Sequence, residues 1–416
     1  MKIAKNTFGM GDRFAHQGKA QLAAVQTAND KGLPIAPVWN KSNREHEIVG
    51  SRPDELRAEA DAAVAALGWK GEYYVDADHI NLKTVDAFLQ GSNFFTLDVA
   101  DSVGVAPEGP DLEAFLEKQR KWLGVLSIPG IGERIELSEA NVRAAAGKFL
   151  AAIRSAGEIY RKIETEKGSG NFVTEVSIDE TDSPQSPVEL FLILAMIADE
   201  GIPVQTIAPK FTGRFNKGVD YVGDPAQFEK EFDQDLCVIA YAVREFGLPA
   251  GLKLSVHSGS DKFSIYPIIN RLIRKHDAGL HVKTAGTTWL EEVIGLADAG
   301  DDGLKLAKAI YKGAYERMEK LTAPYATVID VDAARLPDPS KVEGWSSAEF
   351  VDVLRHDPEN PVYNQHFRQL IHVAFKVAAE MGTEYTDALK RHEEVIARNV
   401  TYNLLQRHIL PIFASL

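Results

Sequence analysis

The stretch Leu252–Ser258 (LKLSVHS) decides the fold, because apolar and polar side chains alternate along it. Leu252, Leu254 and Val256 share one face of an extended chain, and Lys253, Ser255 and His257 share the other. Alternation with period two predicts a half-buried β-strand. Similar short stretches recur along the chain between helix-like segments, the pattern of repeated βα units around a parallel sheet.

Eight such strands are expected, and eight βα units favour a closed (β/α)8, TIM-like barrel over a doubly wound open sheet, the alternative. We take residues 1–416 as one barrel domain. The eight expected strands are Leu33–Trp39, Glu72–His79, Phe94–Val99, Phe172–Asp179, Pro203–Lys210, Leu252–Ser258, Leu280–Thr284 and Ala326–Asp332.

Two segments extend this repeat. Residues 101–170 are expected to form a helical insertion, a loop followed by a long helix from about Ser138 to Lys167, because apolar residues recur there near a 3.6-residue period. Residues 338–416 follow the last expected strand and are expected to form a C-terminal helical extension that covers one end of the barrel.

Composition restricts the partners and the compartment. The 416 residues carry 46 basic and 60 acidic side chains, a formal net charge of −14, which argues against a nucleic-acid partner. A single cysteine, Cys237, excludes a disulfide framework and fits a reducing, cytoplasmic location; we expect it to be a small buried apolar residue. The polar N-terminus does not resemble a signal peptide, and no apolar run is long enough to span a membrane.

Alternation also places unusual side chains inside the barrel. If the apolar residues of each strand face the helices, the other residues face inward. Buried charges are costly unless they are paired or bind a metal, so these residues indicate an active site, with an inert ion-pair network as the alternative. The expected inward residues are Asp76, Asp78, Thr96, Asp98, Glu175, Ser177, Asp179, Lys253, Ser255, His257, His281, Lys283, Asp330 and Asp332. The strand Pro203–Lys210 is ambiguous, and Thr206 and Lys210 face inward only if Ile207 faces outward.

Three features suggest how such a site could work. The loop His257–Lys262 has a glycine turn whose amides and hydroxyls could hold an oxyanion or sugar hydroxyls. Lys283 lies where barrels often bind anions. Glu175, Asp179, His257 and His281 could converge on a divalent metal such as Zn, Mn, Fe or Ni. Complete GxGxxG, GxxxxGK[ST] and HExxH motifs are absent, so the nicotinamide fingerprint is unsupported.

The chain resembles the tagaturonate/fructuronate epimerase family of bacterial hexuronate C4-epimerases. The resemblance follows the order of the chain through nine stretches, of which HSGSDKFSIY and HVKTAGTTWLE are the most specific. The stretches are GMGDRF (9–14), DADH (76–79), TLD (96–98), EVSIDE (175–180), APKF (208–211), KGVDYVGD (217–224), HSGSDKFSIY (257–266), HVKTAGTTWLE (281–291) and RQLIHV (368–373).

This resemblance implies a metal-dependent enzyme that interconverts D-tagaturonate and D-fructuronate. The C4 proton lies β to the C2 ketone and is not acidic, so simple enolisation cannot invert C4, whereas reversible retro-aldol cleavage of C3–C4 can. Transient oxidation at C4 is the alternative mechanism. The residues that we assign are Asp78, Asp179 and Lys283 to catalysis, Arg13, Lys210, Ser258, Ser260, Lys262 and Thr287 to substrate binding, and Glu175, His257 and His281 to the metal.

Asp78 and Asp179 are the expected acid/base groups at the C4 hydroxyl, with His79 and Glu180 as the next candidates. Lys283 or Lys210 is expected to neutralise the substrate carboxylate. Other readings are a different metal-dependent ketose epimerase or isomerase, an aldolase, or a carbohydrate-binding protein on a decayed barrel. The oligomeric state is left open.

Overall fold

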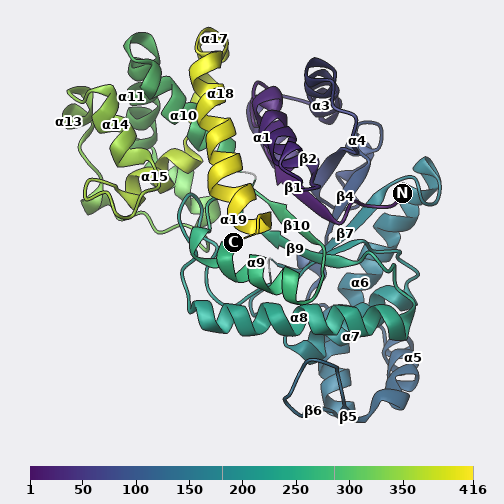
Figure 1. Cartoon of the computed structure of the whole chain (residues 1–416). Coiled ribbons are helices and arrows are strands. Elements are labelled where there is room, and N and C mark those ends of the chain that lie inside the picture. Colours follow the sequence, from purple (N-terminus) through teal and green to yellow (C-terminus); the bar gives the residue numbers. More distant parts are fainter. Residues whose placement is uncertain (180, 285, 416) are drawn as a thin grey trace.

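The fold is a closed barrel of eight parallel strands (Figure 1). The structure is a computed structural model that describes residues 1–179, 181–284 and 286–415. Around the barrel the strand order is β1-β10-β9-β8-β7-β4-β3-β2, which confirms the expected TIM-like architecture. The barrel strands are β1 (Asn6–Met10), β2 (Ala36–Ser42), β3 (Tyr74–Ile80), β4 (Phe94–Asp98), β7 (Val173–Ser177), β8 (Thr206–Ala208), β9 (Lys253–His257) and β10 (Leu280–Lys283).

The interior of the barrel is layered. Near the amino ends of the strands it holds a small apolar cluster that includes Val38, Phe94 and Val173. Above this cluster lie polar side chains, among them Thr96 and Glu175, which are paired in register on β4 and β7. The apolar layer closes the bottom of the barrel, so the polar side chains occupy the carboxyl end, where barrel enzymes hold their active sites.

Seven of the eight expected strands are present, and one is wrong. Ala326–Asp332 alternates like a strand but forms no barrel strand; Val328 O accepts a bond from the amide of Lys217, and Asp330 pairs with Arg214 at 2.6 Å. Asp330 and Asp332 therefore do not face the barrel interior. The remaining strand is β1, a five-residue segment too short and too polar at its start to stand out by alternation.

Helices connect and surround the strands. The first half of the chain contains α1 (Gly18–Asp30), α2 (Asn43–Val49), α3 (Pro53–Leu67), α4 (Val85–Phe88), α5 (Gly109–Gln119), α6 (Glu139–Lys167) and α7 (Pro187–Asp199). The second half contains α8 (Pro225–Phe246), α9 (Tyr266–Lys275), α10 (Thr287–Ala299), α11 (Asp301–Tyr315), α12 (Met318–Thr322), α13 (Pro339–Glu343), α14 (Ser347–Leu354), α15 (Gln365–Val373), α16 (Phe375–Met381), α17 (Thr383–Arg391), α18 (Glu393–Tyr402) and α19 (Leu410–Phe413).

The insertion between β4 and β7 has the expected long helix. Ser138 caps α6 through a reciprocal bond with Asn141, a capping box that fixes where the helix starts. Helix α6 packs against α7, so it serves as the crossover between the two strands, while α5 and the short hairpin β5 (Gly124–Leu126) and β6 (Ile135–Leu137) extend beyond it (Figure 1). Cys237 is buried on α8, as expected.

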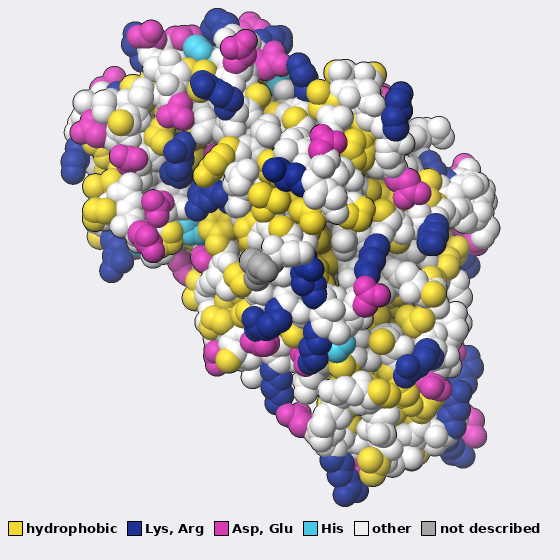
Figure 2. Space-filling model, viewed as in Figure 1, with side chains coloured by type: hydrophobic (Ala, Val, Ile, Leu, Met, Phe, Trp, Pro, Cys, Tyr) yellow, Lys and Arg dark blue, Asp and Glu magenta, His cyan; other side chains and the backbone are white. Residues whose placement is uncertain are grey.

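The C-terminal segment is helical, as expected. Helix α18 packs against α10 and α1, and a π-helical turn, η6 (Asn403–Ile409), continues it into α19, which packs on α9. Helices α11, α13, α14 and α15 gather to one side of the barrel (Figure 1). Acidic, basic and hydrophobic side chains are interspersed on the face in Figure 2. Among the described residues, no helix is both long and apolar enough to cross a membrane.

Candidate active site

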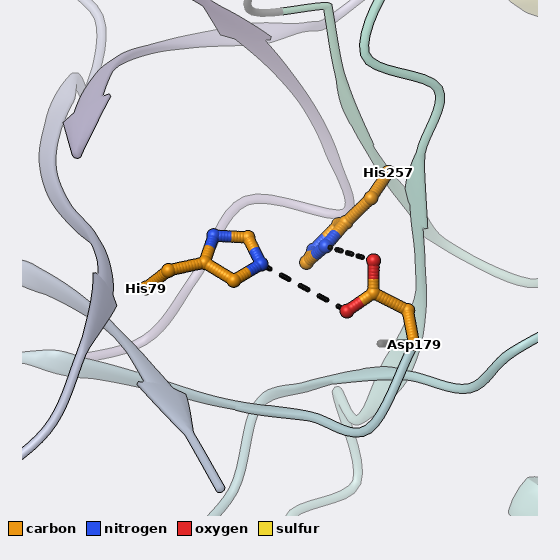
Figure 3. A group of neighbouring side chains, drawn as sticks. All are labelled: His79, Asp179 and His257. Carbon is orange, nitrogen blue, oxygen red and sulfur yellow. Dashed lines mark hydrogen bonds and ion pairs between the residues drawn. The ribbon is translucent and has the colours of Figure 1, made fainter. Parts of the chain in front are cut away.

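Two histidines and an aspartate meet at the carboxyl ends of the barrel strands (Figure 3). His79 lies on β3, His257 ends β9, and Asp179 follows β7. Asp179 lies 3.1 Å from His257 Nδ1 and 3.8 Å from His79 Nε2. One ligand atom from each residue lies within 4.8 Å of the others. Two imidazoles and one carboxylate form a donor set that suits a divalent transition metal and leaves positions open for a substrate.

A backbone irregularity aims His79 into this group. His79 has φ 54°, a left-handed conformation that a residue with a side chain adopts rarely, and the β3–β4 register shifts between Ala77 and Ile80. Such a bulge turns a side chain away from its alternating position. Strict alternation would point His79 outward, so period two alone could not assign it; the only sequence signal is its position beside Asp78.

The second ring nitrogen of each histidine contacts a further carboxylate. His79 Nδ1 lies 2.8 Å from Asp78 Oδ1, and His257 Nε2 lies 2.9 Å from Glu175 Oε1. Histidines that bind metals usually place their other ring nitrogen on a carboxylate or carbonyl, which fixes the ring. The donor set and its supporting carboxylates therefore both fit a metal at His79, Asp179 and His257.

Below this group, Lys283 occupies a pocket of carboxylates. Its Nζ lies 2.8 Å from Asp76 Oδ2, 2.9 Å from Asp78 Oδ1 and 2.9 Å from Glu175 Oε1. Thr96 also accepts a bond from this Nζ. All these side chains are buried, so each charge depends on its partners rather than on water.

In the cluster of Lys283, Asp76, Asp78 and Glu175, the charge of each group shifts the pKa values of the others. Burial opposes ionisation of Glu175 and Asp78, but Lys283 and the neighbouring histidines together outweigh it and hold the pKa of both carboxyls below the usual range. Burial raises the pKa of Asp76 to about 7 despite the attraction of Lys283. Burial would also lower the pKa of Lys283, but the three carboxylates hold it well above its usual value.

The pKa values of His79, Asp179 and His257 are likewise shifted by their charged neighbours. Burial alone would lower the pKa of His257, yet the charge of Asp179, with that of Glu175, raises it to about 9. Asp78 and Asp179 likewise raise the pKa of His79 well above its ordinary value against the effect of burial. The two histidines hold the pKa of Asp179 well below normal, although burial opposes this. The neighbouring carboxylates thus favour the protonated, imidazolium form of both histidines.

His281, expected to be a metal ligand, lies apart from this group. Its Nδ1 lies 2.8 Å from Thr7 Oγ1, and its ring lies 5.2 Å from that of Phe94 in the lower layer of the barrel. Burial lowers its pKa to about 3, so the ring is neutral. Glu175, another of the three expected ligands, contacts His257 and Lys283, and Glu180 lies outside the described residues.

The residues of the loop after β9 are buried and engaged with the protein. Ser258 Oγ donates to the carbonyl of Lys283 at 2.7 Å, and Ser260 Oγ accepts from the amide of Gly218 at 2.9 Å. Lys262 Nζ donates to four acceptors within the loops, including Val219 O at 2.8 Å. These contacts hold the loop in place.

Asp261 in the same loop anchors the C-terminal helices, which the sequence did not reveal. Its carboxylate lies 2.8 Å from Arg368 on α15, 3.1 Å from His356 after α14 and 3.1 Å from His408 in η6. All four side chains are buried. The pairs are separated by 95 to 147 positions in the chain, too far for any local pattern to show them.

The other expected substrate-binding residues are dispersed. Arg13 pairs with Glu45 at 3.0 Å and lies 4.1 Å above the ring of Phe375. Lys210 Nζ donates to the carbonyl of Thr181. Thr287 is buried at the start of α10, and its hydroxyl has no partner among the described residues.

A group of cations missed by the sequence reasoning surrounds Tyr325. Arg44, Lys217 and Lys376 lie 4.4, 5.0 and 5.3 Å from the centre of its ring. Arg44 lies in the first turn of α2, just after β2, and Lys217 lies in the segment after β8, so the group lies toward the carboxyl end of the barrel. We call these three residues the Tyr325 cations.

A closed parallel barrel whose carboxyl end joins histidines, carboxylates and a buried lysine defines an α/β-barrel enzyme. Solved structures agree with this class. The native fructuronate-tagaturonate epimerase UxaE from Cohnella laeviribosi has a TM-score of 0.79 at 25% identity, covering 98% of this chain and 81% of its own. Its complex with two glycerols has a TM-score of 0.81 at 25% identity, with coverages of 99% and 82%.

The family follows from the sequence comparisons. The profile of the tagaturonate epimerases matches residues 1–409. The tagaturonate/fructuronate epimerase of Thermotoga maritima is 31% identical, over 97% of this chain and 80% of its own length. The chain belongs to the tagaturonate epimerase family, a family of carbohydrate epimerases, which confirms the resemblance read from the motifs.

Proposed function

We propose that this chain is a metal-dependent C4-epimerase that interconverts D-tagaturonate and D-fructuronate at the mouth of the barrel. The observation that carries the proposal is the group His79, Asp179 and His257, in which each histidine is also held by a second carboxylate, in a chain of this family. Zn, Mn, Ni and Fe all suit this donor set.

The chemistry must invert a carbon whose proton is not acidic. Removal of the C4 hydroxyl proton allows the C3–C4 bond to break, with its electron pair delocalised onto C3 and the C2 carbonyl, while C4 becomes an aldehyde. Rotation of that aldehyde and reformation of the bond, with return of the proton, inverts C4. A bound divalent metal supplies the Lewis acidity that stabilises the negative charge at C2.

The chain's own residues handle protons and position the substrate. Asp78 and Asp179 are ionised, as described above, and can accept a proton from the C4 hydroxyl. Lys283 keeps the carboxylates beneath the mouth in place. Asp179 also lies in the metal group, so its role and that of Asp78 must be separated by experiment.

Asparagine variants separate these roles. Asp78→Asn should keep the metal and reduce turnover by about 10²–10⁴-fold, the usual contribution of a general base. Asp179→Asn should lose metal as well as turnover, because a carboxylate ligand is replaced by a weaker amide. Metal retained in Asp179→Asn, with turnover lost, would instead make Asp179 the base.

The substrate carboxylate requires a cation. Lys283 Nζ is enclosed by carboxylates and Lys210 Nζ donates to a backbone carbonyl, so the Tyr325 cations are the better candidates. Arg44 is exposed, and all three place their charge near the ring of Tyr325. We assign them to the carboxylate end of the hexuronate.

The decisive test of function is turnover with defined metal content. Purified protein treated with EDTA should lose interconversion of the two uronates, and one of Zn²⁺, Mn²⁺, Ni²⁺ or Fe²⁺ should restore it. His257→Ala should neither bind the metal nor turn over. Full activity in metal-free protein would contradict metal dependence, and no turnover with any of these ions would contradict the epimerase assignment.

Isotope effects test the mechanism. Carbon–carbon cleavage predicts ¹³C effects at C3 and C4 with no primary effect from deuterium on C4. Transient oxidation predicts a primary deuterium effect at C4 and no primary ¹³C effect at C3, because the C4–H bond would break and the C3–C4 bond would not. A primary deuterium effect at C4 would therefore exclude the retro-aldol route.

A further inference from the structure

A second cavity lies away from the barrel mouth, among the C-terminal helices. It has a volume of about 530 Å³ and is lined by residues of α10, α18 and η6 and by the segment after α14. Helix α18 runs beside α10 in this part of the molecule (Figure 1). His79, Asp179 and His257 do not line it. Its volume falls in the range of small-molecule sites.

Cations dominate the lining of this cavity. Arg355, Arg398 and Arg407 face two acidic residues, Glu291 and Asp298. Asp298 lies 3.5 Å from Arg355, so this pair is balanced. In the part of the chain that the structure describes, no hydrogen bond or ion pair involves Arg398. A positive cavity in a chain of net charge −14 concentrates anions locally.

Two of the arginines are held in place before any ligand arrives. Arg407 donates to the carbonyl of His356, and its guanidinium lies 4.3 Å above the ring of Phe263. Arg355 donates to Asn399 Oδ1 at 2.9 Å. Guanidinium groups fixed in this way lose little freedom on binding and suit carboxylate or phosphate oxygens.

A buried amide oxygen in the lining offers a hydrogen-bond acceptor to a ligand. Asn403 is 1% exposed and lines the cavity. Its Nδ2 donates to Glu291 Oε1 at 2.8 Å, whereas its Oδ1 has no hydrogen-bond partner among the described residues. A buried acceptor without a partner is costly, and the hydroxyl of a ligand in the cavity would satisfy it. Asn403 also begins the π-helical turn η6, a feature frequent at functional sites.

We propose that this cavity binds a small hydroxylated anion, a sugar acid or a sugar phosphate, with its charge on the arginines and a hydroxyl on Asn403 Oδ1. The arginines provide donors for the anionic group, and the amide oxygen accepts from a hydroxyl placed beside it, so a sugar anion can use both parts of the site at once. This site is separate from the barrel mouth and does not depend on the proposed epimerase activity.

Calorimetric titration tests the proposal with three probes: D-gluconate, D-glucose 6-phosphate and inorganic phosphate. At least one sugar anion should bind the purified, metal-loaded protein saturably, at least fivefold more tightly than inorganic phosphate. The tighter of the two sugar anions identifies the source of the charge. Arg398→Gln should weaken that binding by about tenfold or more, and the exposed Arg391→Gln, outside the cavity, should leave it unchanged.

Three results would overturn the proposal. These are absence of saturable binding by either sugar anion, equal affinity for inorganic phosphate, and unchanged affinity in Arg398→Gln. Because Arg398 is exposed on α18, its replacement should not prevent folding. His257→Ala provides the last control, since binding that disappears there but persists in Arg398→Gln would belong to the barrel mouth.

Discussion

Lys283→Met removes the cation that faces three buried carboxylates, and we expect it to lower the melting temperature by about 3 to 6 °C. Methionine has a similar length and fills the same space, so the change removes charge rather than volume. Asp76, Asp78 and Glu175 would then lie within reach of one another without the Lys283 ammonium between them.

The expected size follows from the burial of this cluster. Removing one partner of a buried ion pair typically costs about 3–5 kcal/mol, because the remaining charge is left unpaired. At about 2.1 cal/mol/K per residue, the unfolding entropy of 416 residues is about 0.9 kcal/mol/K. Dividing the free-energy cost by the unfolding entropy gives the expected fall in melting temperature. Partial protonation of Asp76 would make that fall smaller.

Calorimetry at pH 8 measures this effect, where Asp76 is mostly ionised. Lys5→Met is the control, because Lys5 pairs with Asp277 in an exposed ion pair and such pairs contribute little. A fall of less than 1 °C in Lys283→Met would refute the argument. If Lys283 instead binds the substrate carboxylate, the variant would stay stable and lose turnover of uronates far more than of the matching neutral ketoses.

Three further predictions concern single positions. In Gly9→Ala the new Cβ would lie 3.0 Å from a backbone oxygen of β10, so we expect a loss of about 1–3 kcal/mol in urea unfolding, whereas Gly109→Ala, with open space around it, should be neutral. Asp76 has a pKa raised from 3.8 to about 7 by burial, so the stability it contributes is present below pH 4 and is lost as the pH rises through 7; the melting temperature of wild type relative to Asp76→Asn should fall across this window, and a constant difference would contradict it. Lys217→Met should raise KM for a uronate at least tenfold more than for the neutral ketose, with Lys121→Met as the exposed control, and equal effects would exclude Lys217 from carboxylate binding.

Alternation predicted the barrel wherever a strand was long enough to show two faces. β3, β4, β7, β9 and β10 all alternate over four or more residues, and their expected spans overlap the observed strands. The sequence Ala326–Asp332 alternates equally well, but it is held by contacts with loops rather than with neighbouring strands. Hydrophobic periodicity shows which face of a segment is apolar, but it does not show which other segments its backbone will hydrogen-bond with.

The site was predicted in part. Asp78, Glu175, His257 and Lys283 meet because inward positions of parallel strands share one interior, which alternation and register determine. His79 joins them only because the backbone bulges, and that depends on the pairing of β3 with β4. Asp261 and Lys217 come from loops, whose positions no periodicity fixes, and Arg44 and Lys376 lie on α2 and α16, which strand alternation does not place.

The charges of the mouth lead to a final prediction, that metal binding releases about two protons. In addition to Asp76, three carboxylates, Asp78, Glu175 and Asp179, lie around Lys283 and the two histidines, His79 and His257. When no metal is bound, both histidines carry protons at neutral pH, because the neighbouring carboxylates raise their pKa values. A metal must bind neutral imidazoles, so each histidine loses one proton when the metal binds. The two positive charges of the divalent ion then replace those of the two protons, and the net charge of the site is unchanged.

In the metal-free protein, the protons on the two histidines thus offset the negative charge of the carboxylates, so the protein can fold before the metal binds. Metal affinity should accordingly rise with pH, by about 100-fold per pH unit wherever both histidines are protonated before the metal binds. Titration calorimetry in buffers of different ionisation enthalpy measures the protons released. His257→Ala should abolish the effect together with the metal. Release of less than one proton, or an affinity independent of pH, would mean that the histidines are already neutral and that the carboxylates around them do not set their charge.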